Sequence, residues 1–158
     1  MKKPVSATPE SGSSARQRLN GLRLALLELH KALVDSERAG YERTFGVIPS
    51  PHHFFRLLLH DPWFAWLHPL SQLIVSLDEA LDGREPLSAA EVEGLVEQCA
   101  RLLAPAENGQ GYGRHYFEAL QRDPDVVLAH ARAVQFITRQ KTRLPPPGEQ
   151  PPPGRSES

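Results

Sequence analysis

The sequence predicts an all-α protein: an irregular helical bundle of about four longer and two short helices with disordered termini. Leucine outnumbers valine, isoleucine and threonine together, and leucine favours helices whereas β-branched residues favour strands. Apolar residues recur at spacings of three and four, and no stretch alternates apolar with polar residues as a half-buried strand would. A capping residue directly before a proline, which is typical of helix starts, occurs at Ser50-Pro51, Asp61-Pro62 and Asp123-Pro124.

The chain of 158 residues is predicted to fold as one domain, over residues 15–144. Residues 1–14 contain few large apolar side chains, so burial cannot offset the entropy of ordering them, and we expect a disordered tail. Residues 145–158 read PPPGEQPPPGRSES, which predicts a second tail, proline-rich and extended or disordered. This tail has two interpretations: a solubilising segment, or a ligand for a proline-binding domain.

The first long helix is predicted over residues 15–44. Leucines at spacings of three and four form one apolar stripe along it: Leu19, Leu22, Leu26, Leu29 and Leu33. A loop follows over residues 45–49, where Gly46 and Pro49 interrupt helical structure. Because Phe45, Val47 and Ile48 are apolar, we expect this loop to pack against the bundle.

Residues 51–60 predict a short helix, and residues 62–82 predict the central helix of the bundle. The apolar stripe of the central helix comprises Trp63, Trp66, Leu67, Leu70, Leu73, Ile74, Leu77 and Leu81, and Phe64 falls on its flank. Pro69 lies inside this helix, where it lacks a donor and crowds the preceding turn, so we expect a kink near residues 66–69. Gly83 follows as a C-terminal cap.

The C-terminal half predicts three more helices. Ser88 and Glu91 form a capping box that begins a helix ending near residue 103. The glycine-rich loop 105–113 is either a plain connector or a mobile, ligand-contacting segment. A short helix over residues 114–122 and a last helix over 124–141 follow, and the last helix is expected to bury Val127, Val134 and Ile137.

Charge and composition exclude several classes of protein. A net charge of −1, without a basic run inside the bundle, argues against nucleic-acid binding. The N-terminus lacks the apolar segment of a secretory signal, and no stretch is long and apolar enough to span a membrane. The single cysteine, Cys99, is expected in the core, and a lone thiol fits a reducing cytoplasm. These observations predict a cytoplasmic protein that binds neither nucleic acid nor membrane.

Histidines raise the alternative of a metal- or cofactor-binding bundle. Four of them lie beside apolar stripes or a carboxylate on different predicted helices: His30, His68, His115 and His130. Helical bundles build metal sites from such side chains on facing helices, together with carboxylates. However, the sequence has no Glu-x-x-His pair and no His-x-x-x-His pair, so a transition metal enters only under this alternative, and no other cofactor is predicted.

Catalysis has weaker support. His68, Ser71 and Asp78 share one flank of the central helix, but Asp78 lies about 10 Å beyond Ser71 along the helix axis, too far for a triad. The sequence contains no nucleophile elbow, no phosphate-binding loop and no zincin motif. The sequence therefore favours a non-catalytic protein.

Aromatic residues favour a binding or protein-interaction function. Five aromatic side chains fall within thirteen residues, more than a small bundle readily buries: Phe54, Phe55, Trp63, Phe64 and Trp66. They either form the main core cluster of the bundle or leave an exposed remainder, which would form a surface for a protein partner or for self-association. Asp78 and Glu79 oppose the helix macrodipole, which suggests a partner such as an arginine or a ligand. The predicted partner-binding residues are Trp63, Trp66, His68, Ser71, Asp78 and Glu79.

The segment HDPWFAWLHPLSQLIVSLDEAL, residues 60–81, resembles a segment of a family of uncharacterised bacterial proteins. Its His-Asp-Pro, aromatic, Trp-Leu, Pro-Leu-Ser and Asp-Glu pattern carries the resemblance. The resemblance implies a bacterial origin and an all-helical fold, and it transfers no catalytic residue.

Overall fold

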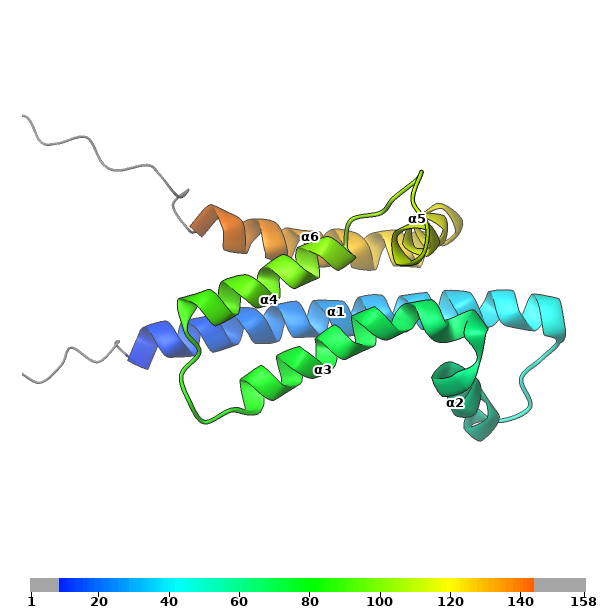
Figure 1. Ribbon diagram of the computed structural model, residues 1–158, viewed down its shortest axis with the longest axis horizontal. Coiled ribbons are helices and arrows are strands. Elements are labelled where there is room, and N and C mark those ends of the chain that lie inside the picture. The colour runs from blue at the N-terminus through cyan, green and yellow to red at the C-terminus, as the bar shows by residue number, and fades with distance from the viewer. Residues whose placement is uncertain (1–8, 144–158) are drawn as a thin grey trace, which may run out of the picture.

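The computed structural model describes residues 9–143 as an all-α bundle, which confirms the predicted fold class (Figure 1). The number of α-helices in these residues agrees with the predicted four longer and two short helices: α1 (Pro9–Phe45), α2 (Pro51–His60), α3 (His68–Asp82), α4 (Ala89–Leu102), α5 (Tyr112–Arg122) and α6 (Pro124–Arg143). A 3₁₀ helix, η1 (Pro62–Leu67), joins α2 to α3, and residues 9–143 contain no strand. The predicted tail at 145–158 and residues 1–8 of the N-terminal tail lie outside the described residues.

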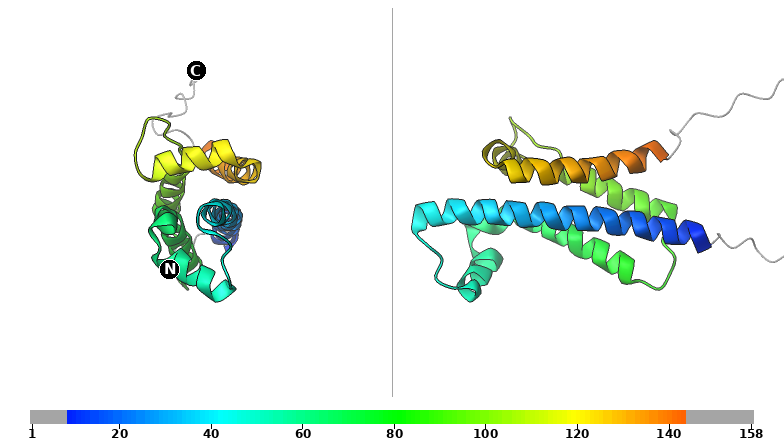
Figure 2. Two further views of the ribbon diagram at one scale, coloured as in Figure 1. Left: turned by 90° about the vertical axis from the view of Figure 1, so that its right-hand side faces the viewer. Right: turned by 180° about the vertical axis from the view of Figure 1, so that it is seen from behind.

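Helix α1 is the element against which most of the bundle packs. It packs against α6 on one side and against α3 on another, and α4 contacts both α3 and α6 (Figures 1 and 2). The five leucines of its predicted stripe are all completely or almost completely buried. The helix begins at Pro9, so residues 9–14, predicted as part of a tail, belong to it. Proline is favourable in a first helical turn, and a helix already formed extends with one hydrogen bond per added residue.

The predicted helix starts are confirmed at three places. The Ser50 hydroxyl accepts a hydrogen bond of 3.1 Å from the His53 amide, and an Asp61 carboxylate oxygen accepts one of 2.9 Å from the Trp63 amide. Ser88 and Glu91 form the reciprocal pair of bonds that defines a capping box. These local bonds satisfy backbone donors that have no partner inside a helix.

The central segment is not one kinked α-helix, as the sequence predicted. Residues 62–67 form η1, and the α-helix begins only at His68, which places Pro69 in its first turn. A proline is tolerated there because the first turn needs no amide donor, whereas its ring would crowd a carbonyl of a preceding α-helical turn. With three residues per turn, a 3₁₀ helix aligns Phe64 with Leu67, so both are fully buried. The prediction that Phe64 lies on the flank was therefore wrong.

Two further packing predictions were wrong in part. In α6, Val127 is 43% exposed and Val126 is fully buried. The inward face of α6 contains two alanines, whose small side chains let α6 approach α1 closely. These inward residues are Val126, Ala129, Ala133 and Ile137. In the predicted loop 45–49, Ile48 packs inward as predicted, whereas Phe45, which is the last residue of α1, and Val47 are exposed.

Glu37 of α1 forms hydrogen bonds with residues of α5 and η1. Glu37 of α1 is 7% exposed, and its carboxylate accepts a hydrogen bond of 2.9 Å from the Arg122 guanidinium at the end of α5. Arg122 also donates to the hydroxyl of the buried Ser36 at 3.2 Å. The Glu37 carbonyl accepts from the Trp63 indole at 3.1 Å. One turn of α1 therefore fixes both α5 and η1.

Candidate functional site

Helix α2 has an inner and an outer face. Its inner face, Phe54, Leu57 and Leu58, is partly buried against the core. The opposite side chains recur at positions i, i+3, i+4 and i+7 and are exposed; we call them the α2 outer face: His52, Phe55, Arg56 and Leu59. Two of them are large apolar side chains left in solvent, since Phe55 is 56% and Leu59 is 47% exposed.

Helix α2 lies apart from the long helices. It contains no buried residue, and it packs mainly against η1. In Figures 1 and 2 it projects from the bundle near the C-terminal end of α1. Its bounds follow from the sequence, because Ser50-Pro51 begins it and Asp61-Pro62 begins the next element. The outer face is therefore presented on a short, separately capped helix.

The inner face holds α2 in a defined position. The Phe54 ring meets the fully buried Phe64 ring edge-on, with centroids 5.9 Å apart, and the Arg38 guanidinium lies 4.6 Å from the Phe54 ring centroid. Phe64 belongs to η1, which Trp63 anchors to α1 through its bond to the Glu37 carbonyl. Aromatic and cation–π contacts of this kind add to burial. The outer face is thus carried on an anchored element.

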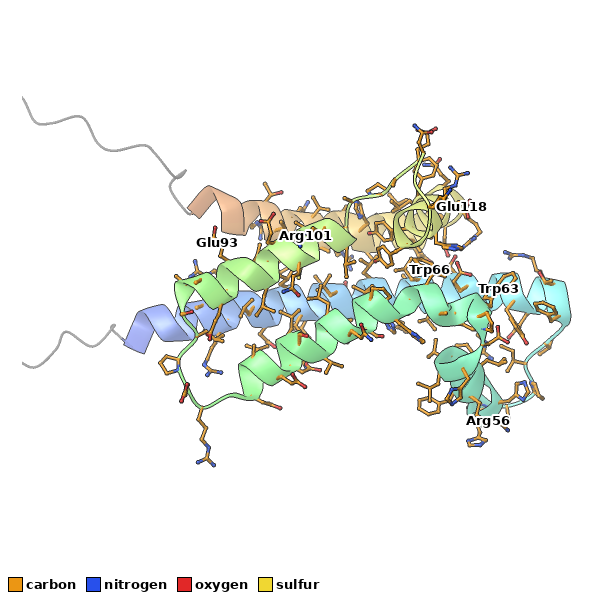
Figure 3. All side chains as sticks on the ribbon, viewed as in Figure 1. Arg56, Trp63, Trp66, Glu93, Arg101 and Glu118 are labelled. Carbon is orange, nitrogen blue, oxygen red and sulfur yellow. The ribbon has the colours of Figure 1, made fainter. Side chains whose placement is uncertain are left out.

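The α2 outer face can carry positive charge but not negative charge. No residue of α2 is acidic, and its ionisable residues are Arg56, His52, His53 and His60. Within residues 14–139, whose side chains the structure describes, the Arg56 guanidinium forms no ion pair. Figure 3 shows Arg56 on α2, away from Trp63 and Trp66 at the junction of η1 with the bundle. An exposed apolar pair beside an unpaired cation is the chemical character of this surface.

The two tryptophans predicted as partner-binding residues are half-buried within the bundle. Trp63 packs against Tyr41 and Phe45, with ring centroids 5.9 Å apart in each case. Trp66 stacks on His115 at 5.4 Å and lies 5.5 Å from the Tyr112 ring. The buried indole nitrogen of Trp66 and the buried hydroxyl of Tyr112 have no hydrogen-bond partner among the described residues. Both tryptophans therefore join η1 to other helices.

The other four predicted residues lie on α3 and are not gathered into one site. The Ser71 hydroxyl donates to the His68 carbonyl at 3.0 Å, which is a local helical contact, and the His68 side chain is exposed. Asp78 forms an ion pair with Arg23 of α1, so an arginine from another helix accounts for its carboxylate. The neighbouring Glu79 is exposed.

The histidines of the metal alternative are not gathered into one cluster. Within residues 14–139, no group of three or more histidine, cysteine, aspartate or glutamate side chains has the geometry to hold a metal ion. His30 lies on α1, His68 begins α3, His115 stacks on Trp66, and His130 lies on α6. The only cysteine, Cys99, is fully buried, and burial raises its pKa to about 12, so its thiol stays protonated near neutral pH.

His130 forms a hydrogen bond of 2.5 Å between its Nδ1 and the hydroxyl of the fully buried Tyr116. Burial raises the pKa of Tyr116 and lowers the pKa of His130, so the phenol donates and the neutral imidazole accepts. Burial also lowers the pKa of His30 below its ordinary value of 6.5. Both histidines are thus held in the neutral form by the fold.

We expect acid to destabilise the protein through these two histidines. Because their pKa values are lower in the folded state, the unfolded state binds more protons, and stability is lost as pH falls below the ordinary value of 6.5 toward the folded values. Urea unfolding at a series of pH values measures the slope. The combined change His30→Gln and His130→Gln should flatten it relative to the unsubstituted chain. An unchanged slope in the double variant would contradict the assignment.

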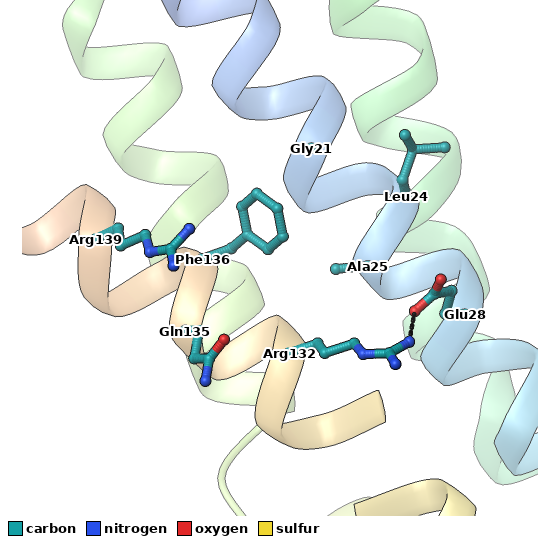
Figure 4. Close-up of a pocket in the computed structure, with 8 residues that line it drawn as sticks. All are labelled: Gly21, Leu24, Ala25, Glu28, Arg132, Gln135, Phe136 and Arg139. Atoms are coloured by element: carbon teal, nitrogen blue, oxygen red, sulfur yellow. Dashed lines mark hydrogen bonds and ion pairs between the residues drawn. The ribbon is translucent and has the colours of Figure 1, made fainter. Parts of the chain in front are cut away.

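A groove of about 270 Å³ lies between α1 and α6 (Figure 4). An ion pair of 3.0 Å between Glu28 and Arg132 bridges it, and Gly21 lies opposite the Phe136 ring. A second groove, of about 410 Å³, lies between α3 and α4 and is lined mainly by apolar and small residues. Both are open to solvent and carry no cluster of convergent, unpaired polar groups among the described side chains.

The close approach of the Phe136 ring in the first groove accounts for the glycine at position 21 of α1. A Cβ atom there would lie 2.7 Å from the Phe136 ring, whereas a Cβ at Gly94 of α4 meets nothing within 4 Å. We expect Gly94→Ala to stabilise the protein by about 0.5–1 kcal/mol through helix propensity. Gly21→Ala should give no such gain, because the Phe136 ring must move to make room for the added Cβ. In a chain that carries Phe136→Leu, Gly21→Ala should again give the stability gain from helix propensity. Thermal unfolding compares the variants, and an equal gain at both glycines would contradict this account.

Comparison of the chain with protein-family models, with curated proteins and with solved structures finds no match. The resemblance over residues 60–81 therefore stays a prediction. Among helices within residues 9–143, none is sufficiently long and apolar to cross a membrane.

Sequence reasoning did not select the α2 outer face as a site. The sequence did predict that five aromatic residues would be hard to bury entirely in a small bundle, and Phe55 is the exposed one of the two phenylalanines in α2. A more specific signal is the run Leu57-Leu58-Leu59. Three consecutive apolar residues cannot all face the same side of a helix, so one of them must point outward.

Proposed function

We propose that this chain is a non-catalytic protein-interaction module that binds its partner through the α2 outer face. The observation that carries the proposal is that α2 is anchored on one side and leaves Phe55 and Leu59 in solvent on the other. Exposed apolar side chains that recur on one helical face, rather than singly, are typical of binding surfaces. The lone thiol Cys99 supports a cytoplasmic location for this interaction.

The rest of the described chain supports binding rather than chemistry. Catalytic sites bring titratable groups together in a cavity. Here two of the polar residues predicted on α3 form local or interhelical contacts: Ser71 with the His68 carbonyl and Asp78 with Arg23. The α2 outer face, in contrast, is exposed along its length, so about half of the surface of Phe55 and of Leu59 remains open to a partner.

A site-specific photo-crosslinker tests the proposal. p-Benzoylphenylalanine replaces Leu59 in one variant and Val75 of α3 in the other, in cells that produce the protein naturally. Val75 is a matched control, because it is 52% exposed on a helix against 47% for Leu59. We expect a discrete adduct of higher mass from position 59 only, identified by mass spectrometry.

The adduct must also depend on the surface beside the crosslinker. Phe55→Asp in the position-59 variant should reduce its yield at least about tenfold, as expected for loss of an interface anchor, and Val75→Asp should leave it unchanged. Equal labelling from positions 59 and 75, or no adduct from either, would contradict the proposed function.

A further inference from the structure

The chemical character of the α2 outer face specifies the kind of partner that it fits. The face presents Phe55 and Leu59 one helical turn apart, with Arg56 and His52 completing the i, i+3, i+4, i+7 pattern. Resting on the proposed function, we infer that its partner is an acidic amphipathic helix, with apolar side chains on one face and carboxylates flanking them. The apolar pair supplies the contact area, and Arg56 supplies the charge that selects the partner.

Charge complementarity favours an acidic partner. Arg56 has no ion pair within the described side chains, and the other ionisable residues of α2 are three histidines. Arg38 pairs with Glu42 at 2.9 Å and Arg114 with Glu118 at 3.0 Å, whereas Arg101, like Arg56, has no ion pair within the described side chains. Arg56 is distinguished by sharing one helical face with the exposed Phe55 and Leu59. An arginine left unpaired beside exposed apolar side chains is complementary to a carboxylate on the partner.

The geometry favours a helical segment. Residues 9–143 contain no strand, so they offer no sheet edge to which an extended peptide could add. An exposed i, i+3, i+4, i+7 row forms a ridge that packs into the grooves between rows on a second helix. A ten-residue helix is about 15 Å long, which suits a short partner segment and a weak, reversible complex.

A second copy of the chain fits less well. Two α2 outer faces brought together would place only cationic or neutral ionisable groups against one another. One exposed helical face also offers far less than the roughly 800 Å² per partner that a stable interface buries. Self-association through α2 is therefore an outcome that the experiment must exclude.

Two fluorescent synthetic peptides of equal length test the inference with the full chain. Both carry leucine at i, i+3, i+4 and i+7; one has glutamate and the other lysine at every flanking position. We expect the glutamate peptide to bind in the micromolar range, at least about tenfold more tightly than the lysine peptide at low salt. Arg56→Glu should remove this preference. The control Arg101→Glu makes the same charge change at an exposed position of α4 and should retain it (Figure 3).

The outcomes separate the inference from the proposed function. If both peptides bind equally and Phe55→Ala abolishes both, the acidic partner is wrong but the α2 outer face remains a binding surface. If neither peptide binds, or if binding survives Phe55→Ala and Leu59→Ala together, the inference is overturned. It is likewise overturned if light scattering detects a dimer that Phe55→Asp dissociates. The inference is also overturned if the protein binds anionic phosphatidylglycerol vesicles but not the peptide, and Arg56→Glu abolishes the vesicle binding.

Discussion

Phe64→Ala is expected to destabilise the protein by about 3–5 kcal/mol, whereas Phe55→Ala should change stability by no more than about 0.5 kcal/mol. Phe64 is fully buried in η1, where its ring contacts Phe54 and Tyr41. Removing it leaves a cavity at the point where α1, α2 and η1 meet. Phe55 is 56% exposed, so its loss leaves no cavity.

Urea denaturation of both variants measures the difference as a shift in the unfolding midpoint. The pair is matched in residue type and differs in burial, so it also tests the correction to the central segment. Similar effects at both positions would mean that Phe64 does not face the core. A stable Phe55→Ala variant is in addition the one required for the peptide-binding experiment.

Arg122→Ala is expected to cost about 2–3 kcal/mol, against at most about 1 kcal/mol for Arg132→Ala. Both arginines pair with a carboxylate of α1 at about the same distance, 2.9 Å to Glu37 and 3.0 Å to Glu28. The difference lies in solvent exposure. The Glu37 side chain is 10% exposed and would lose its cation, whereas that of Glu28 is 56% exposed and would be solvated by water.

The same denaturation experiment compares the two arginine variants. A double variant provides a further check, because Glu37→Leu together with Arg122→Leu removes both charges of the buried ion pair at once. The double variant should be more stable than Arg122→Ala alone, since no unpaired carboxylate remains buried. Equal costs for Arg122→Ala and Arg132→Ala would contradict the assigned burial of Glu37.

The helix starts could be predicted from the sequence because they depend on local chemistry. Ser50-Pro51, Asp61-Pro62 and the capping box at Ser88 act through hydrogen bonds to residues two or three positions away. The buried leucine stripe of α1 could also be predicted, because the same 3.6-residue period continues along a single long helix. For these elements, local sequence and tertiary packing favour the same structure.

The central segment could not be predicted in detail because its phase depends on the helix type. At 3.6 residues per turn the stripe includes Trp63 and omits Phe64, and at three residues per turn Phe64 aligns with Leu67 instead. Contacts with distant residues accompany the 3₁₀ form, such as the bond from Trp63 to the Glu37 carbonyl. Likewise, the inward face of α6 includes the buried alanines Ala129 and Ala133, which a search for large apolar residues overlooks.

The candidate site was less accessible than the fold. Whether Phe55 is buried depends on how many elements cover α2, and only η1 packs extensively against it. The sequence instead drew attention to Asp78, whose carboxylate has its partner in Arg23, fifty-five positions away. A residue that looks unsatisfied along the chain can be satisfied across the fold.

The position of η1 has a spectroscopic consequence. The protein's only two tryptophans, Trp63 and Trp66, both lie in η1, the segment against which α2 packs. Indole emission is sensitive to nearby polar and aromatic groups, and these indoles contact rings of α1 and α5, so the intrinsic fluorescence of the chain reports on the junction of η1 with those two helices. A change in indole emission during unfolding therefore reports on the separation of η1 from α1 and α5.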